Sequence, residues 1–311
     1  MTARLLDGQA LARQIQQELT PEVADFARRH GRPPGLAIVL VGHNPASEVY
    51  VRNKIKAGGD VGFRADLERL PESASLADVL ALVERLNGSD AHDGILVQSP
   101  LPKALGADAA SRVFDAIAPE KDVDGFTPAN VGRMVQGRPA LVACTPSGIV
   151  ELLVREDIAI AGRRACVIGR SDIVGKPLAL LLLQRDATVT VCHSKTADLP
   201  AVCREADILV AAVGRPGLVT KTFVKRGATV IDVGMNTITD AGVASALFPD
   251  GHPKLARFRE RGSVLVGDVH PDVAEVAGAL TPVPGGVGPL TVTMLMWNTL
   301  RAARGRAEGA W

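Results

Sequence analysis

Aromatic residues are scarce in this chain. Its 311 residues include seven phenylalanines, two tryptophans and a single tyrosine. The interior must therefore be packed mainly with Val, Leu, Ile and Ala. Tyrosine is not a general core residue in this chain, so the sequence around Tyr50 is the guide to whether this residue has a special role.

The chain also lacks a charge bias and a long hydrophobic run. Lys and Arg number 35 against 34 Asp and Glu, which gives a net charge of +1 and argues against a nucleic-acid-binding protein or a polybasic membrane anchor. The longest strongly apolar run, near Pro177–Leu183, is far shorter than the roughly 20 residues that cross a bilayer. Residues 1–19 resemble an amphipathic helix more than a signal peptide. We therefore expect a cytoplasmic protein with no membrane partner.

Closely spaced cysteine pairs are missing as well. The four cysteines, Cys144, Cys166, Cys192 and Cys203, show no CxxC spacing, and most lie in or near apolar stretches. This pattern predicts reduced, structural thiols and no metal site.

Short β-branched runs alternate with helical stretches along the whole chain. Fully apolar runs such as LAIVLV and DILVAAV are typical of a parallel sheet that is buried on both faces. The length allows about two domains, with a linker expected near Gln136–Cys144. The expected strands are Leu36–Val41, Asp66–Leu70, Gly94–Gln98, Ala165–Gly169, Thr188–Cys192, Ile208–Val213, Thr229–Val233 and Val264–Val266.

Capping signals mark several helix ends. Ser75 and Asp78 form a candidate capping box, and Asn44-Pro45 and Thr145-Pro146 are each typical of an N-cap followed by proline. The helix that starts at Asn44 is expected to end at Gly58–Gly59. The last helix, about Pro289–Arg304, is expected to pack back on the first half of the chain.

A strand, a turn of small residues and a helix follow one another in RACVIGRSDIVGKPLALLLL. Gly169, Arg170 and Ser171 start the turn, where backbone N–H groups at a helix N-terminus can approach a pyrophosphate. The spacing departs from GxGxxG, so a turn with a purely structural role is the alternative interpretation. The next strand ends at His193-Ser194-Lys195 with no acidic residue before Asp198, which favours NADP over NAD. An ordinary polar loop is the alternative.

Tyr50 and Lys54 lie four residues apart on one expected helix and so share a face. A shielded lysine can have its pKa lowered and carry protons near neutral pH. Taken singly, Lys54 is more typical of a solvated surface and Tyr50 of a half-buried core. Gln98, at the end of a strand, is placed to orient a nearby lysine, and Asp122 and Asp124 follow in a polar turn, where one of them has a structural role.

Seven segments then occur in a characteristic order: ASEVYVRNKIKA, GILVQSPLP, KDVDGFTPANVGRM, CTPSGIVELL, VIGRSDIVGKP, VIDVGMN and TPVPGGVGPLTVTML. In this combination the chain resembles the bifunctional methylenetetrahydrofolate dehydrogenase/methenyltetrahydrofolate cyclohydrolase family, over roughly residues 5–300. The resemblance implies an N-terminal α/β domain for folate and catalysis (residues 1–143 and 286–311, including the returning C-terminal helix) and a Rossmann-like NADP domain (144–285). It also implies a homodimer that acts on tetrahydrofolate derivatives.

The resemblance assigns roles to individual residues. Lys54 would transfer protons, Tyr50 would stack on the folate, Gln98 would tune the lysine and Asp122 would hold the pterin ring. The remaining substrate contacts would come from Val97, Ser99, Pro284, Gly285, Gly286, Val287 and Gly288. The dinucleotide contacts would come from Gly169, Arg170, Ser171, His193, Ser194 and Met235.

The sequence departs from the family pattern at three places. Ser99 stands where leucine is common, Thr127 stands where histidine is common, and Thr237–Val266 is longer than usual, with an inserted loop and a short basic helix. The insert is interpreted as a surface ornament, with a lid or an extra interface as alternatives. Other functions left open are a dehydrogenase without hydrolysis, an enzyme similar to shikimate dehydrogenase, and a dinucleotide-sensing module.

Overall fold

The computed structural model describes residues 3–309, which divide into two compact units. The three-stranded unit comprises Ala12–Cys144 and the described part of Thr291–Trp311. The six-stranded unit comprises the described part of Met1–Leu11 and Thr145–Leu290. Within the described residues, no helix combines the length and the hydrophobicity that crossing a membrane requires.

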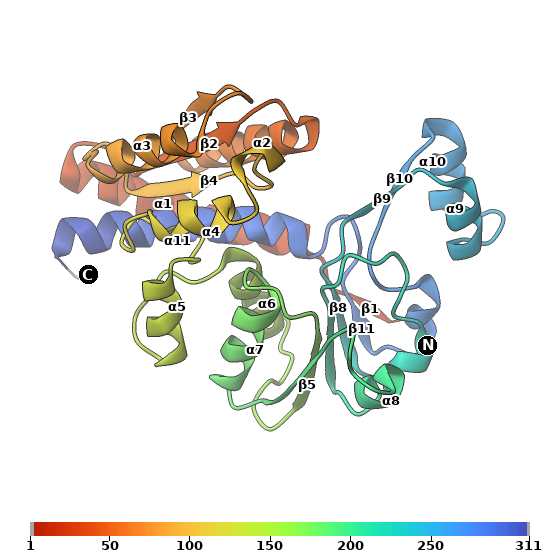
Figure 1. Cartoon of the computed structure of the whole chain (residues 1–311). Helices are drawn as coiled ribbons and strands as arrows, with labels where there is room; N and C mark the ends of the chain where they lie inside the picture. Colours follow the sequence, from red (N-terminus) through yellow and green to blue (C-terminus); the bar gives the residue numbers. More distant parts are fainter. Residues whose placement is uncertain (1–2, 310–311) are drawn as a thin grey trace. The chain divides into compact units, whose positions relative to one another are not determined.

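A short parallel sheet forms the centre of the three-stranded unit (Figure 1). Its order is β3 (Arg64–Leu70), β2 (Gly35–Val41), β4 (Gly94–Val97), and every residue of β2 and β4 is buried. The sequence predicted all three strands to within two residues. The two fully buried strands, β2 and β4, are apolar throughout because both of their faces are covered. The helices that contribute to this unit are α1 (Gly8–His30), α2 (Pro45–Val61), α3 (Leu76–Asn87), α4 (Ala109–Asp115), α5 (Pro128–Val135) and α11 (Val287–Glu308).

The predicted caps are confirmed at α2 and α3. The Asn44 side chain accepts hydrogen bonds from the backbone of Ala46 and Ser47, and Ser75 and Asp78 form a reciprocal capping box. The expected end of α2 at Gly58–Gly59 is wrong. The helix continues to Val61 and ends at Gly62, whose φ of 97° is the left-handed conformation that favours glycine. Gly58 is instead a point of close packing against β3, where a Cβ would lie 3.4 Å from that of Ala65.

The six-stranded unit contains a wholly parallel sheet in the order β1-β11-β8-β7-β5-β6. Four of its strands were predicted, but the two-residue strands β1 and β11 were missed because they are too short to give a periodic signal. Residues 1–19 were expected to form one helix, yet α1 begins only at Gly8, and Met1 and Thr2 lie outside the described residues. The strands are β1 (Arg4–Leu5), β5 (Arg164–Ile168), β6 (Thr188–Cys192), β7 (Ile208–Ala211), β8 (Thr229–Asp232) and β11 (Ala279–Leu280), and the helices are α6 (Cys144–Arg155), α7 (Gly175–Leu183) and α8 (Leu199–Cys203).

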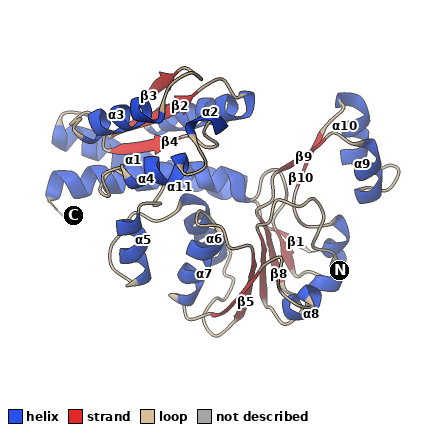
Figure 2. Cartoon of the chain, in the orientation of Figure 1, coloured by secondary structure: helices blue, strands red, loops and turns tan. Residues whose placement is uncertain are grey.

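The long segment after β8 forms a small subdomain of its own. Val264–Val266 is a strand, β10, as predicted, and it pairs antiparallel with β9 (Asn236–Ile238) outside the main sheet. Figure 2 shows this hairpin leading to α9 (Ala241–Leu247) and α10 (Pro253–Arg261). The expected single basic helix is thus accompanied by a second helix, and buried residues such as Phe248, Leu255 and Phe258 give the insert its own hydrophobic core.

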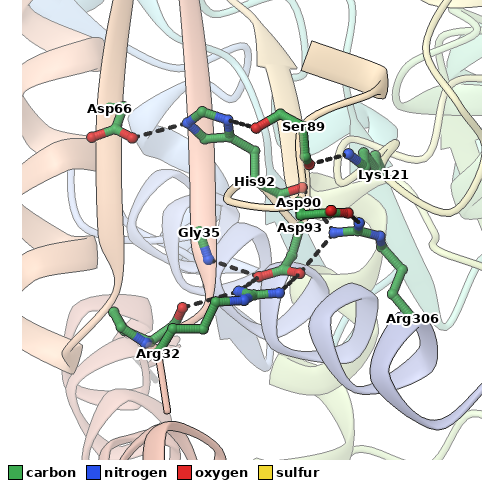
Figure 3. Close-up of polar contacts among 10 residues, drawn as sticks. Arg32, Gly35, Asp66, Ser89, Asp90, His92, Asp93, Lys121 and Arg306 are labelled. Atoms are coloured by element: carbon green, nitrogen blue, oxygen red, sulfur yellow. Dashed lines mark hydrogen bonds and ion pairs between the residues drawn. The ribbon is translucent and has the colours of Figure 1, made fainter. Parts of the chain in front are cut away.

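The C-terminal helix joins the first half of the chain, as expected, through a buried carboxylate (Figure 3). Asp93, which is 0% exposed, accepts hydrogen bonds from Arg32 at 2.7 and 2.8 Å, from Arg306 of α11 at 2.9 Å and from the Gly35 backbone at 2.9 Å. Beside it, the Lys121 amine donates to the Leu86 and Ser89 carbonyls at the end of α3, and burial lowers its pKa to about 8.

Removing the Asp93 carboxylate leaves two guanidinium groups without their shared acceptor. We expect Asp93→Ala to lower the free energy of unfolding by about 3 kcal/mol, since breaking a buried ion pair costs more than losing an exposed one. Asp25→Ala is the control, because Asp25 pairs with Arg28 and Arg29 on the surface of α1, and it should cost under about 1 kcal/mol. Urea unfolding measures both variants, and equal losses would contradict this account of Asp93.

Candidate functional site

Lys54 and Gln98 meet at the carboxyl edge of the three-stranded sheet. Lys54 comes from α2, which follows β2, and Gln98 follows β4, the neighbour of β2 in the sheet. The Lys54 Nζ donates to Gln98 Oε1 at 3.0 Å. The Gln98 amide nitrogen donates to the Ser99 carbonyl at 2.6 Å, which turns the amide oxygen toward the lysine. The structure therefore brings together the pair that the sequence predicted.

Burial disfavours the charged, protonated form of the Lys54 amine. The pKa of its amine is lowered from the ordinary value because the amine is shielded from water, while the nearby Asp124 carboxylate acts in the opposite direction. Burial raises the pKa of Asp124 to about 6, against the influence of the lysine. An amine that releases its proton more readily and a carboxyl that holds its proton more tightly are the two groups suited to proton transfer near neutral pH.

Tyr50 lies one helical turn before Lys54 on α2 and is 40% exposed. Partial burial raises the pKa of its phenol, so the side chain stays neutral at physiological pH. The exposed ring offers a flat apolar surface next to the amine, whereas Val97, the last residue of β4, is buried in the sheet.

The two aspartates of the polar turn are placed differently. Asp122 is 1% exposed, and its oxygens accept hydrogen bonds from the backbone of Phe126 and Thr127 at 3.2 and 2.8 Å and from the Asn130 amide at 3.0 Å. These bonds make Asp122 a turn residue. Asp124, which was not among the predicted site residues, is the carboxylate that interacts with Lys54. Its signal in the sequence was the second acidic residue of KDVDG.

Of the two single-residue departures from the family pattern, Thr127 has a local explanation, whereas nothing in the structure explains Ser99. The Thr127 side chain accepts from the Asn130 backbone and caps α5. At Ser99 the backbone carbonyl, not the side chain, holds Gln98. Sequence reasoning also missed Asn298, whose amide donates to the Val123 and Val142 carbonyls at 2.9 and 2.8 Å and contacts the Cys144 thiol. An asparagine inside a hydrophobic helix was the only available clue.

The predicted dinucleotide turn lies between β5 and α7. Gly169 has a φ of 127°, and a Cβ there would lie 2.3 Å from the Ala212 carbonyl oxygen, so only glycine fits. The Ser171 hydroxyl accepts from the Val174 and Gly175 backbone at 3.2 and 3.3 Å and thereby organises the start of α7. A Cβ on Gly175 would lie 2.3 Å from the Gly169 carbonyl oxygen, which explains why the last glycine comes one residue late.

A pocket of 440 Å³ lies beside this turn, at the carboxyl ends of β5, β6 and β7. Four predicted cofactor residues line it, namely Gly169, Arg170, His193 and Ser194. Thr196 and Arg215 also line it and were missed, since neither belongs to a recognisable motif. Ser171 and Met235 are outside the lining. The Met235 sulfur instead lies 3.6 Å from the position that a Cβ on Gly288 would occupy.

Two buried carboxylates hold the loops at this edge of the six-stranded sheet. Asp232 accepts from the backbone of Gly234, Asp268 and Val269, and burial raises its pKa to about 6. Asp268 accepts from the backbone of Val213, Gly214 and Arg215 and from the Asn236 side chain. The motifs VIDVGMN and VGDV therefore support the loop that carries Arg215.

The Pro284–Gly288 segment joins β11 to α11. Gly285 has a φ of 103°, and a Cβ on Gly286 would lie 2.5 Å from the Pro282 carbonyl oxygen, so both positions require glycine. The Gly285 carbonyl accepts from the Gln9 backbone at 2.9 Å, and Val287 is buried at the start of α11. A Cβ on Gly288 would make only an ordinary contact with the protein.

All four cysteines are buried and free of disulfides, as expected. The fold gathers three of them, Cys166, Cys192 and Cys203, with sulfur atoms within 4.8 Å of one another, which their wide spacing in the sequence did not reveal. Burial raises the pKa of Cys192 to about 11, so this thiol is neutral at physiological pH and packs as a small apolar group.

Comparison with known families identifies both parts of the chain. Residues 6–124 match the model of the tetrahydrofolate dehydrogenase/cyclohydrolase catalytic domain, and residues 143–307 match that of the tetrahydrofolate dehydrogenase/cyclohydrolase NAD(P)-binding domain.

Full-length relatives agree. The chain is 56% identical over 304 residues to a bifunctional protein FolD from Koribacter versatilis, covering 98% of both chains. A similar protein from Moorella thermoacetica is 49% identical over 305 residues, covering 98% of this chain and all of the relative. A Trypanosoma brucei methylenetetrahydrofolate dehydrogenase-cyclohydrolase, solved with NADP cofactor and inhibitor, is similar with a TM-score of 0.87 and 42% identity over 99% of both chains. The chain therefore belongs to the bifunctional tetrahydrofolate dehydrogenase/cyclohydrolase family and contains both its catalytic and its NAD(P)-binding domain.

Proposed function

We propose that this chain catalyses two successive reactions on one folate. The first is NADP-dependent oxidation of 5,10-methylenetetrahydrofolate to the 5,10-methenyl cation, and the second is hydrolysis of that cation to 10-formyltetrahydrofolate. The observation that carries the proposal is the Lys54–Gln98 hydrogen bond beside Asp124, within a chain that belongs to this family. It supplies a shielded amine for proton transfer.

The oxidation needs orientation more than acid or base catalysis. When bound, NADP would supply the hydride acceptor for the one-carbon bridge, and the folate would be left as a cation. The chain's task is to hold the two rings face to face at contact distance. The turn at Gly169–Ser171 and the glycines of Pro284–Gly288 suit this task because exposed backbone without Cβ atoms lets flat ligands approach closely.

The hydrolysis needs one proton carrier. Water adds to the bridging carbon and gives a proton to the neutral Lys54 amine. The carbon–N5 bond then breaks, N5 receives the proton of the new hydroxyl group, and the other proton is released to solvent. Gln98 acts by holding the amine in place, and the lowered pKa of Lys54 provides its neutral form.

The folate ring is proposed to lie between Tyr50 and a carboxylate. An aminopyrimidine presents paired N–H donors, which a carboxylate accepts well. We assign this role to Asp124 instead of the expected Asp122, because the oxygens of Asp122 already accept hydrogen bonds from its own turn. The exposed Tyr50 ring provides the stacking surface.

The dinucleotide is proposed to be NADP. Arg170, His193 and Ser194 line the pocket at the strand ends, and Arg215 adds a second guanidinium. No acidic side chain lines this pocket among the residues described, so a 2′-phosphate would meet positive charge and hydroxyl donors there. The related enzyme from Trypanosoma brucei, which was solved with NADP, supports this choice.

Family membership supports further proposals. We propose a cytoplasmic homodimer that acts on tetrahydrofolate derivatives. We also propose a folate-binding catalytic domain of residues 1–143 and 286–311 and an NADP domain of residues 144–285. Family membership and the joining of α11 to the three-stranded unit support this division.

Replacing Lys54 tests the hydrolytic step. Lys54→Met should lower methenyltetrahydrofolate cyclohydrolase activity by about 10²–10⁴-fold, since the proton carrier is lost, while NADP still binds. Lys56→Met is the matched control, because Lys56 lies on the same helix in an exposed pair with Asp60. A spectroscopic assay of methenyl decay measures both variants. Full hydrolysis by Lys54→Met would remove this residue from the mechanism.

The electrostatic link between Lys54 and Asp124 can be measured without substrate. Because the Asp124 carboxylate raises the pKa of Lys54, Asp124→Asn should lower that pKa below its wild-type value. Titration of ¹³C-methylated lysines by NMR reports the change, with Lys56 as an exposed reference. An unchanged or higher Lys54 pKa would contradict the proposed contact.

Dinucleotide choice depends on positive charge at the pocket. The protein should reduce NADP in preference to NAD with methylenetetrahydrofolate, and Arg170→Ala should cut the NADP/NAD ratio of kcat/KM by about tenfold, equivalent to about 1.4 kcal/mol. Lys176→Ala, which removes a lysine paired with Asp172, should leave the ratio unchanged. A wild-type protein that reduces only NAD would show the assignment to be wrong.

A further inference from the structure

Three buried thiols meet in the core of the six-stranded unit, and neither of the two proposed reactions uses them. Cys166 comes from β5, Cys192 ends the neighbouring strand β6, and Cys203 ends α8. The Cys166 sulfur lies 3.6 Å from the Cys192 sulfur and 3.8 Å from the Cys203 sulfur, and all three sulfurs lie within 4.8 Å of one another. We call this group the three-thiol cluster.

The parallel sheet places the first two thiols on one face. Cys192 is the register partner of Ile168, which stands two residues after Cys166, so the two cysteine side chains project to the same side of the sheet. Cys203 packs in the same apolar core. The pairing of β5 with β6 and the position of α8 therefore bring together thiols that lie far apart in the sequence.

The first two thiols are not arranged for a disulfide. Their offset of two residues separates the Cα atoms of Cys166 and Cys192 by about 8 Å, from a strand spacing of about 4.8 Å and a rise of about 3.3 Å per residue. A disulfide needs a Cα separation under about 7 Å, so without backbone movement these sulfurs can be joined only through an intervening atom. Three bonds of about 2.3 Å from one atom, the length of a zinc–thiolate bond, would place the sulfurs about 3.5–4 Å apart, which is close to the observed distances.

The surroundings of the three-thiol cluster favour an uncharged product. The three cysteines are at most 1% exposed and pack among apolar side chains such as Leu209 and Val219. The pKa of Cys166 is raised by its hydrogen bond with Cys203 and by burial, and burial also raises the pKa of Cys192 to about 11. A net charge left in such surroundings is costly. An atom that binds three thiolates there should therefore carry three positive charges itself.

Common thiophilic metal ions meet this requirement poorly. A zinc ion with three thiolates keeps one negative charge, and structural zinc sites have four ligands. Within the described chain, the group of neighbouring His, Cys, Asp and Glu ligands comprises only these three cysteines. A copper(I) ion with three thiolates keeps two negative charges. Trivalent arsenic fits better, because it forms three bonds to sulfur and its product with three thiolates is neutral.

Trivalent arsenic also approaches the cluster as an uncharged molecule. In neutral water it exists as arsenous acid, As(OH)₃, and a small neutral solute can enter an apolar region when that region opens locally. Ile168 and Leu199 line the dinucleotide pocket and also pack in the apolar core around the cluster. The cluster therefore lies behind one wall of that pocket.

We infer that Cys166, Cys192 and Cys203 form a binding site for trivalent arsenic, which enters as arsenous acid. Each thiol hydrogen combines with one hydroxyl group of arsenous acid, so that three As–O bonds break, three As–S bonds form and three water molecules leave. Arsenic stays trivalent and sulfur keeps its oxidation state, so the step needs neither an oxidant nor a reductant. The inference goes beyond the proposed function and does not depend on it.

The test incubates the full chain with sodium arsenite, in a phosphine reductant that does not compete as a dithiol would. The intact mass of wild-type protein should increase by one arsenic atom and decrease by three hydrogen atoms. X-ray absorption should show three sulfur neighbours around the arsenic. An adduct that retains a hydroxyl group, an arsenic with only two sulfur neighbours, or no adduct at all would overturn the inference.

Alanine variants assign the three bonds. Cys166→Ala, Cys192→Ala and Cys203→Ala should each weaken arsenite binding by at least about tenfold, measured as arsenic retained after gel filtration across a range of arsenite concentrations. Cys144→Ala is the matched control, because Cys144 is also buried but lies outside the three-thiol cluster, and it should keep the wild-type affinity.

The variants can also contradict the inference. Unchanged affinity in any of the three cluster variants, or an equal loss in Cys144→Ala, would show that arsenic binds elsewhere. Circular dichroism checks that each variant is folded. If a cluster variant fails to fold, the mass and the X-ray absorption spectrum of the wild-type adduct still decide the question.

Discussion

The proposed mechanism depends on one constraint, a lysine that loses its proton easily. Water would favour the charged ammonium, so the amine has to be shielded, but it also needs a partner that holds it in position. Gln98 meets both requirements, because a neutral amide oxygen accepts the hydrogen bond without adding a negative charge. A carboxylate in the same place would hold the proton on the amine. Asp124 acts through space, and its own raised pKa of about 6 limits that effect.

Three buried carboxylates, in contrast, hold the fold together. Asp93, Asp122 and Asp268 accept several hydrogen bonds each, from backbone N–H groups, arginines or amides. Such carboxylates have a structural role, because a lone pair that accepts a hydrogen bond from a loop is not available to a ligand. This distinction is what separates Asp122 from Asp124, although the two stand two residues apart in the same turn. Asp122, whose oxygens already accept hydrogen bonds, belongs to the structural framework, whereas Asp124, near the Lys54 amine, belongs to the candidate site.

The insert shows how a family framework accommodates an addition. Its hydrophobic core is internal to the segment, and its hairpin starts where β8 ends, so the parallel sheet keeps its register. The hydrogen bond from Lys254 to the Val283 carbonyl places a positive charge of the insert beside the Pro284–Gly288 segment.

Local signals predicted much of this protein from its sequence. The buried strands, the caps at Asn44 and Ser75 and the one-turn spacing of Tyr50 and Lys54 depend only on neighbouring residues, and the structure shows all of them. Positions that depend on distant residues could not be predicted in this way. The antiparallel pairing of β10, for example, depends on a partner 26 residues or more away. The choice between Asp122 and Asp124 was likewise decided by the tertiary structure, because only there do the hydrogen bonds of one and the lysine beside the other become visible.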